Sequence, residues 1–145
     1  MKDIEIKQIS LNSEDYRQET DLRNKVLRKP LNMNLYDEDL SDEKDQIHFA
    51  AFSKGKVIGT LILVPQSLEI IKMRQVAVDF SFQNMGVGQN LIVFSEKYAR
   101  EHSFSKIELH ARKVASGFYK HMGYQIAGDE FFEINIPHFK MYKNL

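Results

Sequence analysis

Residues 76–90 read VAVDFSFQNMGVGQN, and this stretch decides which fold the chain can adopt. It opens on the end of an apolar run typical of a buried strand and passes through a short loop into residues with helical spacing. The loop ends in Gly86 and Gly88, which have no side chain to block a ligand from the backbone. Because the first amides of a helix are unpaired and carry partial positive charge, the stretch predicts a phosphate or pyrophosphate site.

Two familiar phosphate motifs do not fit this stretch. A P-loop requires Gly-Lys followed by Ser or Thr, which is absent from the sequence. A dinucleotide fingerprint requires a third glycine three positions after Gly88, where the chain has Leu91. An ordinary glycine turn between a strand and a helix is the alternative interpretation, and a lone Gly-x-Gly would favour it.

The sequence on either side of this stretch alternates between strand and helix patterns. Apolar alternation and β-branched runs predict seven strands, at residues 4–9, 47–53, 56–64, 68–78, 106–110, 124–127 and 139–142. Helical spacing predicts three helices, one capped by Ser13 and ending before Pro30, one over 86–102 and one over 115–122. The order β-α-β-β-β-α-β-α-β-β is an α+β layout, with helices packed on a mainly antiparallel sheet.

Length, charge and cysteine content exclude several classes of protein. A chain of 145 residues predicts one domain, residues 1–145. Its 20 Lys and Arg balance 20 Asp and Glu, whereas a nucleic-acid or anionic-membrane binder usually has a basic excess. With Cys 0 there is no disulfide, thiolate zinc site or cysteine nucleophile. No run approaches the roughly 20 apolar residues of a membrane span, so we expect a soluble, cytoplasmic protein.

One segment departs from this balance. Residues 37–45, DEDLSDEKD, hold six acidic side chains in nine positions. A solvated loop is the ordinary interpretation of such a run, and a flap beside a functional site is the other.

Two motifs together resemble those of the GNAT superfamily of N-acetyltransferases. Gln-x-x-Gly-x-Gly after a strand ending in Val-Ala-Val is similar to its acetyl-CoA pyrophosphate motif, and residues 115–124, ASGFYKHMGY, are similar to its A-x-x-F-Y-x-x-x-G-F/Y segment. The resemblance implies a GNAT fold, with a mixed, mainly antiparallel seven-stranded sheet, helices on both faces and a split between the fourth and fifth strands. It implies that acetyl-CoA binds to Val76, Ala77, Val78, Gln83, Asn84, Met85, Gly86, Val87 and Gly88.

Within that superfamily the chain resembles the glyphosate N-acetyltransferase group, at residues 22–28, 73–77, 111–119 and 137–143. This resemblance implies that Arg28, Arg74 and Arg112 bind an anionic acceptor. It also implies that His138 is the general base and Tyr119 the general acid. The chain departs from the group at Ile136, where glyphosate acetyltransferases have glycine.

The residue types suit these roles chemically. Imidazole, with an ordinary pKa of about 6.5, can remove an ammonium proton near neutral pH, and a phenol can return a proton to a departing thiolate. The Val76 backbone N–H could stabilise the oxyanion. A guanidinium meets a carboxylate or phosphonate with two parallel hydrogen bonds.

Each of these side chains also has an ordinary structural interpretation. His138 could be a strand-edge histidine bonded to the backbone, and Tyr119 could be a core aromatic. Each arginine could form a surface ion pair, for which residues 37–45 supply partners. Substitute bases are available among the glutamates, although solvated carboxylates are the expected state of Glu69, Glu130 and Glu133. No metal is expected, because no carboxylate pattern of the H-E-x-x-H kind accompanies His102, His110 or His121.

The sequence therefore predicts an acetyl-CoA-dependent N-acetyltransferase that acts on a small, anionic, amino-acid-like amine. Without cysteine we expect direct attack by the amine rather than an acyl-enzyme. Two alternatives remain open: acetylation of a protein or peptide amine, and a non-catalytic acyl-CoA-binding module. We expect no nucleic-acid or membrane partner, and the sequence leaves a homodimer open.

Overall fold

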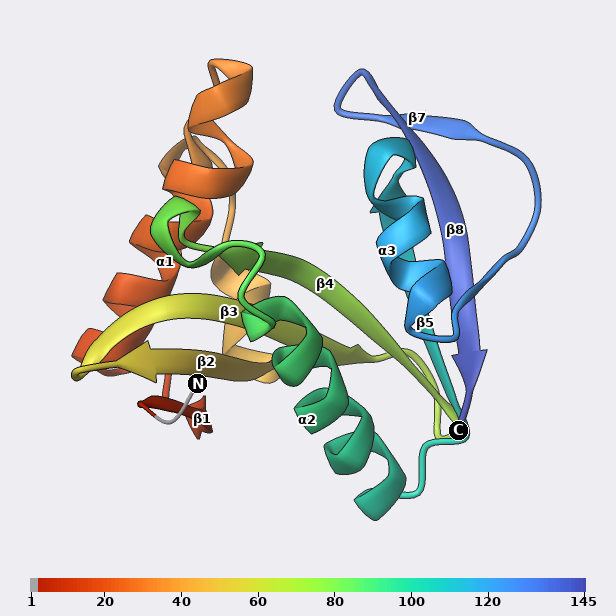
Figure 1. Ribbon diagram of the computed structural model, residues 1–145, viewed down its shortest axis with the longest axis horizontal. Coiled ribbons are helices and arrows are strands. Elements are labelled where there is room, and N and C mark those ends of the chain that lie inside the picture. Colours follow the sequence, from red (N-terminus) through yellow and green to blue (C-terminus); the bar gives the residue numbers. More distant parts are fainter. Residues whose placement is uncertain (1–2) are drawn as a thin grey trace. The chain divides into compact units, whose positions relative to one another are not determined.

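The structure is a computed structural model that describes residues 3–145 (Figure 1). Its strands and helices are β1 (Ile4–Ile9), α1 (Glu14–Leu27), β2 (Ile47–Ser53), β3 (Lys56–Pro65), β4 (Ile70–Val78), α2 (Val87–Glu101), β5 (Lys106–Arg112), α3 (Ser116–His121), β6 (Gln125–Ile126), β7 (Phe131–Glu133) and β8 (Ile136–Asn144). Short 3₁₀ turns lie at η1 (Lys29–Leu31), η2 (Leu35–Asp37), η3 (Ser41–Asp45), η4 (Phe80–Phe82) and η5 (Lys113–Ala115).

The described residues form eight strands, so the expected number of seven was wrong by one. The extra strand is β7, which pairs with β8 through a two-residue turn of Ile134 and Asn135 at φ 46° and 59°. Such turns usually contain Asn-Gly or Asp-Gly, and a β-branched residue is rare at positive φ. The sequence therefore gave no turn signal here, whereas the predicted turn at Lys54 and Gly55 has φ values of 51° and 77°.

The chain divides into two compact units. The first holds the described residues up to Val64 together with Gln75–Ser95, and the second holds Pro65–Arg74 and Glu96–Leu145. In the first unit, β1 and β3 pair antiparallel with β2. In the second, the start of β4 pairs parallel with β5, and β8 pairs antiparallel with β5, β6 and β7. The prediction of a mixed, mainly antiparallel sheet is confirmed.

Helices cover both faces of the sheet in the first unit. Ala50 and Phe52 of β2 pack with Leu22 of α1, and a bulge after Ala51 brings Val57 to this same face. The opposite face meets α2, since a Cβ added to Gly59 would lie 3.0 Å from side-chain atoms of both Val87 and Leu91. Glycine at position 59 thus allows the first turns of α2 to approach the sheet closely.

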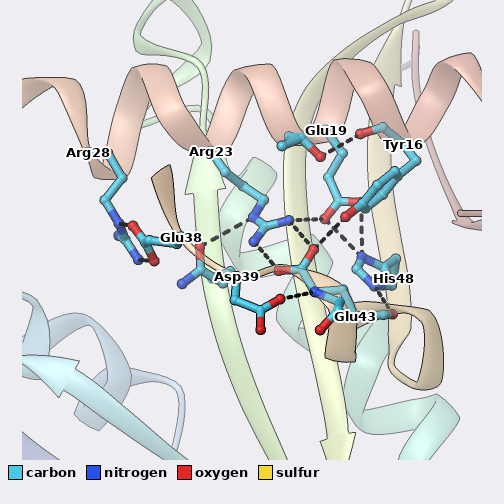
Figure 2. Close-up of polar contacts among 11 residues, drawn as sticks. Tyr16, Glu19, Arg23, Arg28, Glu38, Asp39, Glu43 and His48 are labelled. Carbon is cyan, nitrogen blue, oxygen red and sulfur yellow. Dashed lines mark hydrogen bonds and ion pairs between the residues drawn. The ribbon is translucent and has the colours of Figure 1, made fainter. Parts of the chain in front are cut away.

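A buried ionic cluster joins α1 to the segment that follows it. We define it as Tyr16, Glu19, Arg23, Glu43 and His48, whose contacts are drawn in Figure 2. The Arg23 guanidinium, which is fully buried, donates two hydrogen bonds of 2.8 and 2.5 Å to the Glu43 carboxylate and a longer one of 3.4 Å to Glu19. The Tyr16 hydroxyl donates a further bond of 2.8 Å to Glu43.

The fifth member of the cluster, His48, faces an acceptor at each ring nitrogen. Its Nδ1 lies 3.0 Å from both carboxylate oxygens of Glu19, and its Nε2 lies 3.0 Å from the Glu43 carbonyl oxygen. Both contacts are hydrogen bonds when both ring nitrogens carry a proton. His48 thus links the Glu19 carboxylate of α1 to the backbone of the acidic segment.

The acidic segment 37–45 is therefore not solvated throughout. Most of its carboxylates are exposed, but Glu43 is only 2% exposed and lies inside the ionic cluster. Burial by itself would raise the pKa of Glu43, but hydrogen bonding to Arg23, the charges of Arg23 and His48 and the bond from Tyr16 lower it. Glu43, which by composition seemed to belong to a solvent-exposed run, therefore holds the segment against α1.

Candidate active site

The predicted pyrophosphate loop lies between β4 and α2 in the first unit. Gln83, Asn84, Met85 and Gly86 are exposed, and α2 begins at Val87, which is only 1% exposed. Gly86 has φ 84°, a conformation that glycine adopts without a steric penalty. The loop thus presents backbone to solvent directly before the helix N-terminus, which fits the binding of an anionic phosphate group.

Side chains around the loop hold it against the end of β4. The Gln83 side-chain amide donates a hydrogen bond of 3.0 Å to the Val78 carbonyl. Asp79 accepts one from the Ser81 backbone amide and one from Lys25, both at 3.0 Å. The amide of Ser81 is the main cause of a lowered pKa at Asp79, and Lys25 contributes to it. Asp79 was not a predicted site residue, although an acid at this turn is a typical cap.

The other predicted cofactor residues, Val76, Ala77 and Val78, form the last part of β4. Ala77 is buried and the two valines are half-buried. The residue before them, Gln75, has φ 57°, so the strand is locally distorted where the cofactor segment begins. A non-glycine residue in this conformation leaves no signal in the sequence.

Tyr119 lies on α3 in the second unit. Its ring makes edge contacts with Phe118 and Tyr124, at centroid distances of 5.2 and 5.9 Å. Within the described residues, no group is hydrogen-bonded to its hydroxyl. Burial raises the pKa of Tyr119 to about 12. The phenol therefore keeps its proton at neutral pH, which a general acid requires.

His138 lies on β8 and is 4% exposed. Its Nδ1 is 2.7 Å from the Ile136 carbonyl oxygen, which can only accept, so Nδ1 carries a proton and donates it. In the neutral ring the lone pair is then on Nε2, which is the atom that could accept a proton from an amine. His138 can thus be bonded to the backbone through Nδ1 and act as a base through Nε2. The two predicted interpretations are therefore compatible.

Glu133, at the end of β7, lies next to this histidine. One of its carboxylate oxygens is 3.0 Å from Nδ1 of His110, and the other is 3.7 Å from Nε2 of His138. Phe131 contacts both imidazole rings. Partial burial by itself would raise the pKa of Glu133, but the hydrogen bond from His110 and the positive charges nearby lower it. We had expected Glu133 to be a solvated carboxylate, but it is paired with His110.

The other two glutamates that we expected to be solvated, Glu69 and Glu130, are at least partly exposed. Glu69 is exposed, and Glu130 forms a partly exposed ion pair of 2.8 Å with Lys113.

The three predicted acceptor arginines lie in different surroundings. Arg28 follows α1 in the first unit and is paired with Glu38 of the acidic segment, with Nε 2.6 Å from the carboxylate. Arg74 and Arg112 are half-buried in the second unit. Arg112 is the register partner of His138 across β5 and β8. Side chains of such directly opposite residues project to the same face of a sheet, so a cation and the candidate base are neighbours.

Neither a metal-binding cluster nor a membrane-spanning helix is found in residues 3–145. No three His, Cys, Asp or Glu side chains gather there in a way that could hold an ion. No helix in that range is both long and apolar enough to cross a bilayer.

Comparison with known proteins decides the family. Residues 11–145 match the family model described as an acetyltransferase (GNAT) domain. The chain belongs to the GNAT acetyltransferase family. A Bacillus subtilis protein described as an acetyltransferase is 28% identical over 116 residues, which cover 72% of this chain and 76% of that protein. The match identifies the GNAT family as a whole, and the narrower resemblance to glyphosate acetyltransferases stays a prediction.

Solved GNAT structures have the same fold. An N-acetyltransferase from Lactobacillus plantarum superimposes with a TM-score of 0.88 at 22% identity, covering 98% of each chain. A GNAT acetyltransferase from Elizabethkingia anophelis, solved with acetyl-CoA bound, gives 0.75 at 19% identity and covers 100% of each chain. The predicted α+β GNAT fold is therefore confirmed.

Proposed function

We propose that this GNAT enzyme transfers the acetyl group of acetyl-CoA to the amine of a small acceptor that also carries an acid group. The observation that carries the proposal is the register pairing of Arg112 with His138. A base beside a guanidinium suits an acceptor whose amine and acid group are close together, as in an amino acid or an aminophosphonate. Arg74 would contribute to the same recognition.

Arg28 has a weaker case than the other two arginines. Its guanidinium already contacts both oxygens of Glu38, at 2.6 and 3.3 Å, and its side chain is only 9% exposed. An acceptor would have to displace that carboxylate. Arg28 would therefore bind the acceptor only if the acid group of the acceptor replaced the Glu38 carboxylate.

The chemistry follows from the groups described above. Bound acetyl-CoA would supply the acetyl thioester, with its pyrophosphate at residues 83–88. Nε2 of His138 would remove a proton from the acceptor ammonium, and the nearby Glu133 carboxylate would stabilise the imidazolium that results. The Val76 N–H would donate a hydrogen bond to the developing oxyanion. Tyr119 would give its proton to the departing thiolate, so that the amide forms without an acyl-enzyme.

A basic peptide is the less favoured acceptor. That alternative relied on the acidic segment 37–45 to supply free carboxylates. Glu43 is buried against Arg23 and the exposed Glu38 is paired with Arg28, so two of its six acids already have a basic partner in the same chain. The direct test is a comparison of acceptors that share an amine but differ in the acid group, which we take up at the end of the Discussion.

Binding of acetyl-CoA can be tested separately, with Gly86→Ala. We expect the Kd for acetyl-CoA to rise on the order of 10-fold, because a side chain disfavours φ 84° and adds a methyl group where backbone must meet the ligand. Isothermal titration calorimetry measures the change.

Gly55→Ala is the matched control for this variant. Gly55 has a similar φ of 77°, and at both glycines an added Cβ would meet nothing within 4 Å. Both variants should therefore lose a similar amount of stability, while only Gly86→Ala weakens acetyl-CoA binding. Equal Kd values in the two variants would place the pyrophosphate elsewhere.

A further inference from the structure

The distorted residue Gln75 stands directly before the cofactor segment of β4. Its φ of 57° lies in the left-handed region, which is unfavourable for a residue that has a side chain. Such a conformation persists only where the surroundings hold it in place.

Arg23 is a buried group that binds the Gln75 side chain. Its Nε donates a hydrogen bond of 3.2 Å to Oε1 of Gln75, the one contact of the guanidinium that leaves α1 toward β4. Its two Nη atoms donate three further hydrogen bonds to the carboxylates of Glu43 and Glu19. Figure 2 shows the guanidinium enclosed by these partners beneath α1. Arg23 is fully buried, so it is a fixed anchor rather than a mobile surface side chain.

The anchor continues beyond Arg23 through the rest of the ionic cluster. Glu43 also accepts from Tyr16, and Glu19 lies against His48, so both carboxylates that hold the guanidinium are themselves held. A buried network in which every member has a partner is rigid. Rigidity at Arg23 is therefore passed to the side chain of Gln75 and, through it, to the backbone.

We propose that Arg23 and Gln75 are positioning residues, which fix the β4 distortion so that the Val76 N–H is aimed at the thioester carbonyl oxygen. This inference rests on the proposed function, because it assigns the Val76 N–H to that oxygen. An oxyanion donor is worth about 10²–10³-fold in kcat, and small displacements of a catalytic group are costly. The ionic cluster would then serve catalysis without touching substrate.

Substitution of Gln75 tests the proposal with little risk to the fold, since this side chain is only half-buried. Gln75→Met keeps the length of the side chain but removes the acceptor for Arg23. We expect kcat to fall about 10-fold and the KM for acetyl-CoA to stay within about two-fold, because the oxyanion donor acts mainly in the transition state. Gln75→Glu restores an oxygen toward Arg23 and should recover at least half of the wild-type kcat.

Gln18→Met is the matched control. The Gln18 side chain accepts a hydrogen bond of 3.0 Å from the Val57 backbone amide, so its loss is chemically similar but concerns another strand of the same unit. We expect its kcat to stay within two-fold of wild type. An unchanged kcat in Gln75→Met, an equal loss in Gln18→Met, or no recovery in Gln75→Glu would each overturn the proposal.

A spectroscopic readout separates this inference from the proposed function. Isotope-edited infrared spectroscopy of acetyl-CoA labelled at the thioester carbonyl reports hydrogen bonding to that oxygen without turnover or acceptor. In the wild type the bound carbonyl band should lie below that of free acetyl-CoA, and in Gln75→Met it should move back toward the free value. A wild-type shift that is unchanged in the variant contradicts the inference alone. A bound but unshifted band in the wild type contradicts both the inference and the oxyanion role given to the Val76 N–H under the proposed function. Failure of the wild type to bind acetyl-CoA contradicts the proposed function and this inference with it.

Discussion

Arg23→Met is expected to lower the free energy of unfolding by about 3–5 kcal/mol, the usual cost of removing one partner from a buried ion pair. The variant leaves the Glu43 and Glu19 carboxylates buried without the guanidinium that binds both. For a domain of this size the loss corresponds to a fall in Tm of roughly 6–20 °C. Chemical denaturation at neutral pH measures it.

Arg17→Met is the control on the same helix. Arg17 also contacts two carboxylates, those of Glu14 and Asp21, but its side chain is 64% exposed. Water already solvates these charges, so we expect the stability of this variant to stay close to wild type. Similar losses in both variants would mean that burial of the Arg23 pair has no special importance.

The gap between wild type and Arg23→Met should also depend on pH. In the wild type the pKa of Glu43 is lowered, so this carboxylate contributes stability above its unfolded pKa of about 4.5 and loses it as pH falls through the lower folded value. Without Arg23, burial favours the protonated acid. The difference in unfolding free energy should therefore be largest at neutral pH and shrink as the pH falls through the acidic range.

Tyr119→Phe is expected to lower kcat by about 10²–10⁴-fold, the range for loss of a positioned general acid. Burial raises the pKa of Tyr119 to about 12, so the wild-type phenol holds a proton throughout the working range. Phenylalanine keeps the ring contacts with Phe118 and Tyr124 but has no proton to give. Because no described group is hydrogen-bonded to the hydroxyl, we expect stability and acetyl-CoA binding to change little.

Tyr142→Phe is the control for this substitution. The Tyr142 hydroxyl donates an exposed hydrogen bond of 3.3 Å to Gln125, and the ring stays beneath Lys106 in the variant. Its kcat should match the wild type. Wild-type turnover in Tyr119→Phe would show that the thiolate leaves without this phenol.

Local signals in the sequence were sufficient for most of the fold. Ser13 caps α1 and accepts from the Tyr16 amide, and the helix ends at Leu27, three residues before Pro30. These features depend on residues close together in the chain, where capping and proline geometry act directly. The strand count failed at the β7–β8 turn, where Ile134 adopts positive φ, and the sequence carried no signal of the same conformation at Gln75.

Side-chain partners far apart in the sequence were beyond this kind of reasoning. Glu43 looked like one acid in a solvated run, yet Arg23, 20 positions earlier, draws it inside the protein. Glu133 comes close to His138 only because the unpredicted β7–β8 hairpin folds it back. The candidate residues could be chosen from motifs, whereas their pairings depend on the tertiary structure.

The central claim is that the acceptor is a small amine with an acid group, and the acceptor preference of the wild-type enzyme tests it most directly. With acetyl-CoA in excess, thiol release is measured for amino acids and aminophosphonates, for the matching amino-acid amides, for polyamines and for a basic peptide. The account predicts a kcat/KM at least about 10-fold higher for an acid-bearing amine than for its amide, since loss of a charged partner costs more than 1.4 kcal/mol. Preference for polyamines or the peptide, or binding of acetyl-CoA with no transfer to any amine, would contradict it.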